Sequence, residues 1–210
     1  MWRYEKRLQY PVNIKEPNAK IAKYIISQYG GPDGEINASL RYLSQRYTMP
    51  HGMQKAVLTD IGTEELAHME MIAAMVHQLT RGLSAEELEA QGFAPYYIDH
   101  TAAIYPQAAG GGALNANQIQ SKGDPITDLF ENLAAEQKAR TTYDNILRVV
   151  KDPDVCDPIR FLRKREIIHF QRFGEALRDL QDRLDSRNFY AFNPSFDKNP
   201  QMAGGADCKK

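Results

Sequence analysis

The sequence contains two Glu-x-x-His pairs in segments of helical periodicity: Glu65 with His68, and Glu166 with His169. Residues three apart on a helix share a face, with Cβ atoms about 5–6 Å apart, so both members of a pair can reach one metal ion. Carboxylates balance the charge of metal ions and can bridge two of them, and imidazole nitrogens suit first-row metals. The residue types and their spacing therefore indicate metal chemistry.

These residues fall on the apolar faces of their segments. An ionised carboxylate in an apolar core is unfavourable by several kcal/mol unless something pairs with it. Glu136 occupies such a position in a third segment, so three helices would direct polar groups toward one core. Carboxylates and imidazoles that converge in a helical bundle are the ligands of a dinuclear metal centre.

Each of these residues also has a simpler interpretation. Glu64 competes with Glu65, because Glu64 and His68 are four residues apart and could form a surface pair. Glu136 could be the buried ion-pair partner of Arg140, which lies one turn later on the same face. Two Glu-x-x-His pairs with a core-facing glutamate between them favour the metal interpretation over these alternatives.

The first helix should contribute one carboxylate to a bundle site of this kind. Glu35 is the candidate, although the helix dipole also favours an acid such as Asp33 or Glu35 in a first turn. Tyr42 could line the site or serve as a core aromatic. Three histidines are interpreted as surface or packing residues: His51, His77 and His100.

Helices must position these groups, and the pattern is helical over most of the chain. Apolar residues recur at steps of three and four, and strand signals are scarce. The predicted long helices cover residues 18–29, 32–47, 53–80 and 124–150, followed by a last one with an apolar stripe to residue 184. This last helix is predicted to begin at Asp157-Pro158, where an N-cap precedes a proline, with Asp152-Pro153 as the rival start.

Residues 82–122 are predicted to form an excursion between two of the long helices. Ser84 and Glu87 make a capping box for a short helix that ends at Gly92, and the remainder is predicted to be loop. The whole pattern predicts an all-α, ferritin-like four-helix bundle with a long crossover. We expect one domain over residues 1–185 and an irregular tail over 186–210.

The composition fits one globular domain: 210 residues with a formal net charge of -1 at pH 7. This balance gives no reason to expect nucleic acid as a partner, and no apolar stretch approaches the roughly 20 residues needed to cross a membrane. The N-terminus lacks the apolar region of a secretory signal. The two cysteines, Cys156 and Cys208, form no disulfide framework. We therefore expect a cytoplasmic protein.

Several segments around the candidate residues resemble the manganese catalases, especially a shorter branch associated with bacterial spore coats. The similarity covers roughly residues 1–195 and includes the start of the chain from Met1-Trp2 to Pro11. The other matching segments are QYGGPDGE at 28–35, RYLSQRY at 41–47, TDIGTEELAHMEMIA at 59–73, QSKGDPITDL at 120–129, AAEQKAR at 134–140 and FLRKREIIHFQRFGEAL at 161–177.

The resemblance implies a ferritin-like bundle that binds two manganese ions per subunit and disproportionates hydrogen peroxide to water and dioxygen. Carried over by position, five residues become metal ligands: Glu35, Glu65 and His68 for one ion, Glu136 and His169 for the other, with Glu65 bridging both. Glu166 would be the catalytic acid and base beside the ions rather than a ligand. The resemblance also implies a homohexamer.

Two positions depart from some members of this family. Those members carry an arginine immediately before the third glutamate, where this chain has Ala135. Arg140, on the same stripe, could supply a positive charge instead. Some members also bind calcium between subunits through acidic residues. Ala56 and Asp60 occupy that region here, so no calcium site is predicted.

Two other interpretations remain open. A di-iron carboxylate oxidase or peroxidase would use the same pattern, with Glu166 as a direct ligand, so ligand identity alone does not separate manganese from iron. The chain could instead be mainly a structural protein of the spore coat, located there with other coat proteins as partners. Residues 82–122 and 186–210 would then be interaction surfaces.

Overall fold

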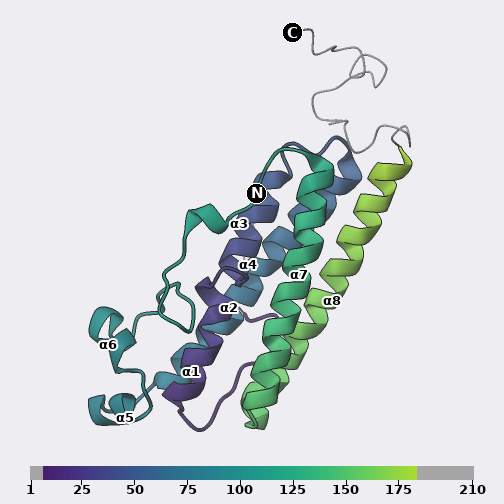
Figure 1. Ribbon diagram of the computed structural model, residues 1–210. Helices are drawn as coiled ribbons and strands as arrows, with labels where there is room; N and C mark the ends of the chain where they lie inside the picture. Colours follow the sequence, from purple (N-terminus) through teal and green to yellow (C-terminus); the bar gives the residue numbers. More distant parts are fainter. Residues whose placement is uncertain (1–6, 184–210) are drawn as a thin grey trace, which may run out of the picture.

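The fold is described by a computed structural model for residues 7–183, so the predicted tail over 186–210 lies outside it (Figure 1). Within this range the helices are α1 (Ala19–Ile25), α2 (Ser27–Gly30), α3 (Glu35–Gln45), α4 (Gly52–Thr80), α5 (Ala85–Ala90), α6 (Ala94–His100), α7 (Pro125–Val149) and α8 (Pro153–Asp182). One 3-10 turn spans Ala116–Gln118. The described residues contain no strand, only an isolated bridge between Gln107 and Ala113. None of these helices is long and apolar enough to span a membrane.

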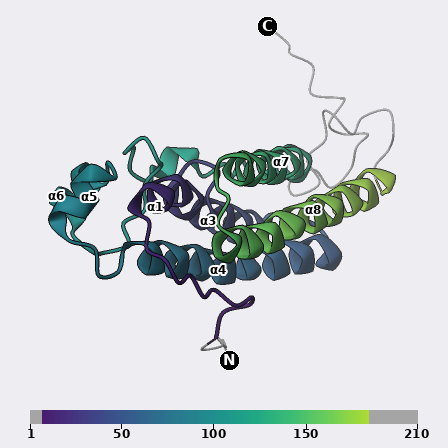
Figure 2. The same ribbon diagram turned by 90° about the horizontal axis from the view of Figure 1, so that it is seen from below.

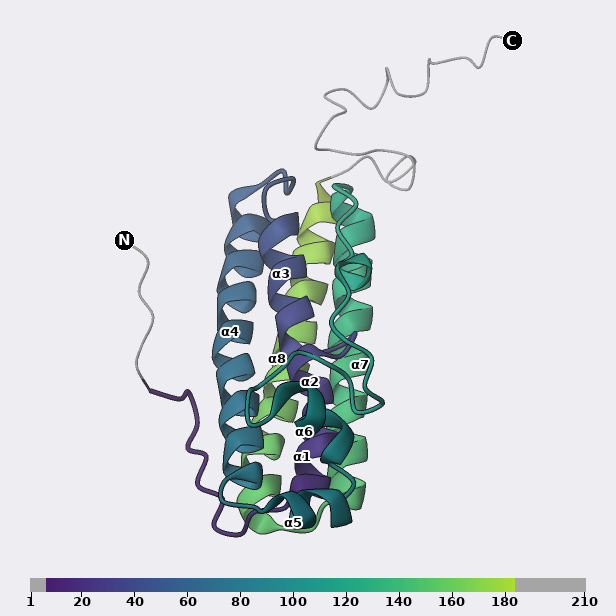
Figure 3. The same cartoon turned by 90° about the vertical axis from the view of Figure 1, so that its left-hand side faces the viewer.

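Helices α3, α4, α7 and α8 lie side by side as a bundle, with α1 and α2 leading into α3 (Figure 3). Short turns connect α3 to α4 and α7 to α8. The segment between α4 and α7 instead runs back along the bundle, so α4 and α7 point in the same direction (Figure 1). Consequently α3 is antiparallel to α7, and α4 is antiparallel to α8. This long-crossover arrangement confirms the predicted ferritin-like fold.

The helices α7 and α8 each begin where an aspartate N-cap precedes a proline. The side chain of Asp124 accepts a hydrogen bond from a backbone N–H three residues later (2.8 Å), as predicted. For α8 the cap is Asp152, which accepts from an N–H two residues later (2.9 Å). The predicted start at Asp157 is wrong and the rival start at Asp152 is confirmed, with Pro158 inside α8. The carboxylate of Asp157 instead accepts from the hydroxyl of Tyr10 (2.7 Å).

The excursion between α4 and α7 holds more helix than predicted. The capping box of Ser84 and Glu87 is confirmed at the start of α5, and Gly92 follows the end of that helix with a φ of 74°. The prediction of loop beyond Gly92 is wrong for α6, which has Pro95 in its first turn. Tyr96 is buried on α6, a tertiary contact that no local pattern reports. Figure 2 shows α5 and α6 beside α1, at the side of the bundle away from α8.

The excursion returns to touch the bundle at Gly30. A Cβ placed on Gly30 would lie 2.3 Å from the Cα of Pro106, so only glycine permits this approach of two backbones. Beside it, the hydroxyl of Ser27 accepts a hydrogen bond from the N–H of Ala109 (2.6 Å). Gly30 thus ends α2 and also lets the excursion dock against that helix.

Two apolar clusters fill the interior of the bundle and leave a polar layer between them. On α4, Glu65 lies between Ile61 of one cluster and Met71 of the other. On α8, Glu166 and His169 lie in the same way between Leu162 and Phe173. The candidate residues are therefore enclosed by apolar side chains on both sides.

Candidate metal centre

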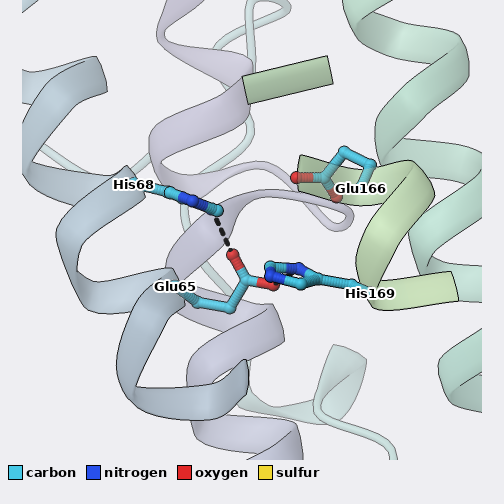
Figure 4. Close-up of side chains that lie close together, drawn as sticks. All are labelled: Glu65, His68, Glu166 and His169. Carbon is cyan, nitrogen blue, oxygen red and sulfur yellow. Dashed lines mark hydrogen bonds and ion pairs between the residues drawn. The ribbon is translucent and has the colours of Figure 1, made fainter. Parts of the chain in front are cut away.

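The polar layer brings together two residues from α4 and two from α8 (Figure 4). One donor atom each from Glu65, His68, Glu166 and His169 lies within 4.8 Å of the others, and all four side chains are buried. Helix geometry aligns each pair, since a spacing of three places both side chains on one face. The two Glu-x-x-His pairs thus meet between the antiparallel helices α4 and α8.

Glu65 lies between the two imidazole rings. Its Oε2 is hydrogen-bonded to Nδ1 of His68 (2.7 Å), and its Oε1 lies 2.9 Å from Nδ1 of His169. The second contact is short but is not aligned as a hydrogen bond, so both of its atoms remain without a hydrogen-bond partner. The two rings are nearly parallel, with centroids 5.5 Å apart. One carboxylate therefore faces both histidines, as a bridging ligand must.

Glu35 on α3 and Glu136 on α7 each lie beside a different histidine. Glu35 Oε2 is 3.9 Å from His68 Nδ1, and Glu136 Oε2 is 3.6 Å from His169 Nδ1. Both glutamates are buried, so Glu35 does more than serve as an acid in a first helical turn. The structure brings all six predicted residues together: four form the cluster, Glu166 included, and Glu35 and Glu136 lie beside its histidines.

Arg140 takes no part in this cluster. Its guanidinium bonds to Asp144 (2.6 Å) and to Gln137 (2.8 Å), and Asp144 also accepts from Arg163 on α8. Although Arg140 lies one turn after Glu136 on α7, its guanidinium bonds to this partly exposed network instead of to Glu136. The alternative of a buried ion pair between Glu136 and Arg140 is therefore wrong, and Arg140 does not bring its charge to the cluster.

Two buried tyrosines bond to glutamates of the facing helix. Tyr42 on α3 donates to Oε1 of Glu136 on α7 (2.5 Å), and Tyr143 on α7 donates to Oε1 of Glu35 on α3. Burial and nearby carboxylates raise the pKa of both phenols well above the usual value, so both remain donors at neutral pH. Tyr42 could be expected near the site from the sequence, whereas the role of Tyr143 is apparent only from the fold.

Glu64, considered as a surface partner of His68, has a different position. Its Oε2 lies 3.1 Å from Nε2 of His169, and its Oε1 lies 3.6 Å from Nε2 of His68. Arg165 donates to both oxygens (2.7 and 2.9 Å), and Gln9 donates to one (2.6 Å). Although burial raises the pKa of Glu64, these contacts lower it well below the usual value. An ionised Glu64 therefore hydrogen-bonds the outer nitrogen of His169 and lies within ion-pair distance of the outer nitrogen of His68, while Nδ1 of each ring faces Glu65.

The carboxyl groups of the cluster differ in protonation. Burial and the charge of Glu65 raise the pKa of Glu35 well above its usual value, and burial with neighbouring carboxylates does the same for Glu166. Burial also raises the pKa of Glu65, but the two histidines lower it further, to below its usual value. Burial lowers the pKa of His68, yet the adjacent glutamates raise it to about 9. Without metal the cluster therefore holds several protons, which must leave when a metal binds.

The donor atoms fit metal ions because several of them have no other partner. Four inward-facing atoms make no hydrogen bond: Glu65 Oε1, Glu136 Oε2, Glu166 Oε1 and His169 Nδ1. Buried polar atoms nearly always have a hydrogen-bond partner, so four neighbouring atoms without one need an explanation. Carboxylate oxygens with imidazole nitrogens suit manganese or iron in a bundle core. The residues present are therefore those of a dinuclear centre.

One spacing relates the two halves of the site and was overlooked in the sequence. An offset of 101 positions connects four pairs of residues: Glu35 and Glu136, Tyr42 and Tyr143, Glu65 and Glu166, His68 and His169. In the fold this offset relates α3 and α4 to α7 and α8. Comparison of the chain with itself at this offset would have identified Tyr143 beside Tyr42.

Comparisons with known proteins agree with this geometry. The chain matches the family described as manganese containing catalase over residues 1–199. It is 50% identical over 190 residues to Protein CotJC of Bacillus subtilis (strain 168), which covers 90% of this chain and 100% of that protein. It is 31% identical to a probable manganese catalase of Clostridium acetobutylicum, which covers 90% of this chain and 85% of that protein.

A solved structure is similar in fold as well. KatB, a manganese catalase from Anabaena, superposes with a TM-score of 0.81 at 30% sequence identity, which covers 88% of this chain and 83% of that chain. The long-crossover bundle, the converging glutamates and histidines and the match over nearly the whole sequence lead to one conclusion. The chain belongs to the family of manganese-containing catalases.

Proposed function

We propose that this protein is a dimanganese catalase that disproportionates hydrogen peroxide to water and dioxygen. The observation that carries the proposal is the buried cluster of Glu65, His68, Glu166 and His169, with donor atoms within 4.8 Å of one another. Two further buried glutamates add a carboxylate beside each histidine. Four carboxylates and two imidazoles are the donor set of dinuclear bundle sites. Membership of the family favours manganese as the metal.

Five residues would hold the two ions: Glu35, Glu65 and His68 the first, Glu136 and His169 the second, with Glu65 shared. The contacts support this division, because the two oxygens of Glu65 face different histidines. Each remaining glutamate has one oxygen directed to the histidine of its own group. Glu64 would act from outside, by orienting both imidazoles.

When bound, the two manganese ions would exchange two electrons with each peroxide, so that two molecules of hydrogen peroxide yield two of water and one of dioxygen. Peroxide that leaves as water must gain protons, and peroxide that leaves as dioxygen must lose them. Glu166 can hold a proton, because burial raises its pKa well above the usual value, and its Oε1 has no other partner. We therefore assign Glu166 to deliver a proton in one half-reaction and to recover it in the other.

The apolar clusters on either side of the site support this chemistry. Because apolar side chains enclose the polar layer on both sides, Glu166 would be the nearest group able to exchange a proton with bound peroxide. The clusters also hold the side chains of the layer in fixed positions, which keeps donor groups ready for the reaction.

The proposal is tested by metal analysis of protein expressed with manganese and iron both available, together with oxygen release from peroxide. Two manganese ions per chain with oxygen release support the proposal. The double substitution Glu65→Gln with His68→Gln should abolish both. A matched control replaces Glu70 and His77, which are exposed on the same helix, and should change neither.

A di-iron carboxylate site is the second candidate, and the position of Glu166 favours it. The donor oxygen of Glu166 lies as close to the others as a ligand would. In a di-iron site Glu166 would bind metal directly. Two irons per chain, with metal lost in Glu166→Gln, would replace the manganese proposal.

Resemblance to the spore-coat branch supports a structural candidate as well. The 50% identity to Protein CotJC leaves room for a coat component with a homohexameric assembly and coat proteins as partners. The Glu65 and His68 double variant separates the possibilities. Normal assembly with metal and oxygen release lost identifies an enzyme, whereas wild-type protein that assembles but never releases oxygen identifies a scaffold.

A further inference from the structure

The two site tyrosines occupy equivalent positions in the two halves of the bundle. Tyr42 follows Glu35 by seven residues on α3, and Tyr143 follows Glu136 by seven residues on α7. Seven residues are about two helical turns, or about 10.5 Å along the axis. Because α3 and α7 are antiparallel, each tyrosine lies level with the glutamate on the other helix.

Each phenol holds one oxygen of its glutamate and leaves the other oxygen facing a histidine. Tyr143 donates to Oε1 of Glu35, and Oε2 of Glu35 lies 3.9 Å from Nδ1 of His68. In the other half, Tyr42 donates to Oε1 of Glu136, and its Oε2 lies 3.6 Å from the second histidine. The order of phenol, carboxylate and imidazole is the same in both halves.

We propose that Tyr143 is a positioning residue for Glu35 and thereby for the metal position that Glu35 shares with His68. The inference rests on the proposed metal site. The terminal torsion of a glutamate is broad, so a carboxylate on one helix rotates freely unless a partner fixes it. A packing role does not explain the hydroxyl, because phenylalanine would fill this buried space without needing a polar partner.

The test is manganese binding by Tyr143→Phe, measured in competition with a chelator. Partners that orient a metal ligand typically change affinity by about 10- to 100-fold, and we expect such a loss at one of the two metal positions. At a chelator concentration where the wild type keeps both ions, the variant should keep one. Its electron paramagnetic resonance spectrum should then be that of an isolated Mn(II) ion rather than a coupled pair.

Tyr96→Phe is the matched control. Tyr96 is also a buried tyrosine whose hydroxyl is hydrogen-bonded, but it lies on α6 and its partners are Ala103 and Tyr105. It should keep both ions and the coupled spectrum. If Tyr143→Phe binds manganese with wild-type affinity at both positions, the proposal is overturned, because the tyrosine would then serve only as a packing residue.

A second variant separates positioning from general destabilisation. If Tyr143 acts through Glu35, adding Tyr143→Phe to Glu35→Gln should weaken manganese binding little further. Fully additive losses would show that Tyr143 acts on the fold instead. A wild type with two ions but no oxygen release would end only the catalase proposal, since these measurements concern binding. A wild type without metal would end both proposals.

Discussion

Arg165 on α8 donates two hydrogen bonds to the carboxylate of Glu64 on α4, at 2.7 and 2.9 Å. This two-point contact fixes the plane of the carboxylate, which then faces the outer nitrogens of both histidines. The orientation of both imidazoles therefore depends on the carboxylate of Glu64, which Arg165 holds in place. The pair is also partly exposed, with 15% of the Glu64 side chain accessible.

Removing the guanidinium should loosen both imidazoles at once. In Arg165→Gln we expect manganese affinity to fall by about 10- to 100-fold, the usual effect of losing a partner that orients a ligand. Chelator competition measures the change. The control is Arg172→Gln on the same helix, which loses an ion pair with exposed Asp60 and should bind normally. Equal manganese affinity in the two variants would mean that Arg165 only links helix α4 to helix α8 and does not orient the imidazoles.

Glu166→Gln should separate proton transfer from metal binding. The amide keeps the size of the side chain but cannot exchange a proton with peroxide. We expect metal content to be unchanged and oxygen release to fall by about 10²- to 10⁴-fold, the usual contribution of an acid or base. Elemental analysis and an oxygen electrode report the two quantities. Loss of metal in this variant would contradict the assignment and identify Glu166 as a ligand.

Manganese affinity should rise with pH up to about 9. In the metal-free protein the pKa of His68 is raised to about 9, so below that pH manganese must displace its proton. Each proton displaced makes log K rise by about one per pH unit, and the part of the rise that comes from His68 should end once His68 is neutral. Titration at several pH values measures the slope. A flat profile between pH 6.5 and 9 would show that His68 is not a ligand.

The raised pKa of His68 also predicts that the metal-free protein becomes less stable at alkaline pH. The pKa of His68 is higher in the folded chain than its ordinary value of 6.5, so its contribution to stability is complete below pH 6.5 and is lost as pH rises through about 9. Glu35 and Glu166, whose pKa values are also raised, act in the same direction. Thermal unfolding should therefore occur at lower temperature at pH 9 than at pH 6.5. Unchanged unfolding would contradict the predicted protonation of the cluster.

A methyl group at Gly30 should disturb the docking of the excursion. Its Cβ would lie 2.3 Å from Pro106 Cα, so one backbone must move. We expect Gly30→Ala to destabilise the fold by about 1–3 kcal/mol, the usual effect of forcing an extra group into a packed contact. Denaturant unfolding measures the change. Gly110→Ala is the control, because its Cβ would meet nothing within 4 Å and stability should hold.

The bundle and the cluster of glutamates and histidines could be predicted because the relevant signals are local. Helical period places Glu65 and His68 on one face, and the same argument places Glu166 and His169. The start of α8 was ambiguous, since two Asp-Pro pairs offer the same cap and only tertiary contacts decide between them. Helix α6 was missed because the burial of its aromatic residues depends on distant parts of the chain.

The groups around this cluster were harder to predict than the cluster itself. Helical spacing puts Glu64 within reach of His68 but does not show that it also reaches His169 on another helix. Tyr143 reads as an ordinary core aromatic, because its partner Glu35 lies 108 residues away. Contacts between helices depend on their relative height and rotation, which periodicity within one helix does not encode.

The offset of 101 positions also bears on how the protein arose. An offset shared by four pairs of site residues is what tandem duplication of one two-helix segment leaves behind. In such an ancestor two identical copies would have supplied equal halves of the site. In the present sequence Glu64 and Arg165 occupy the same place at this offset yet carry opposite charges. The two equivalent positions bind each other, so the two halves of the site are not equal.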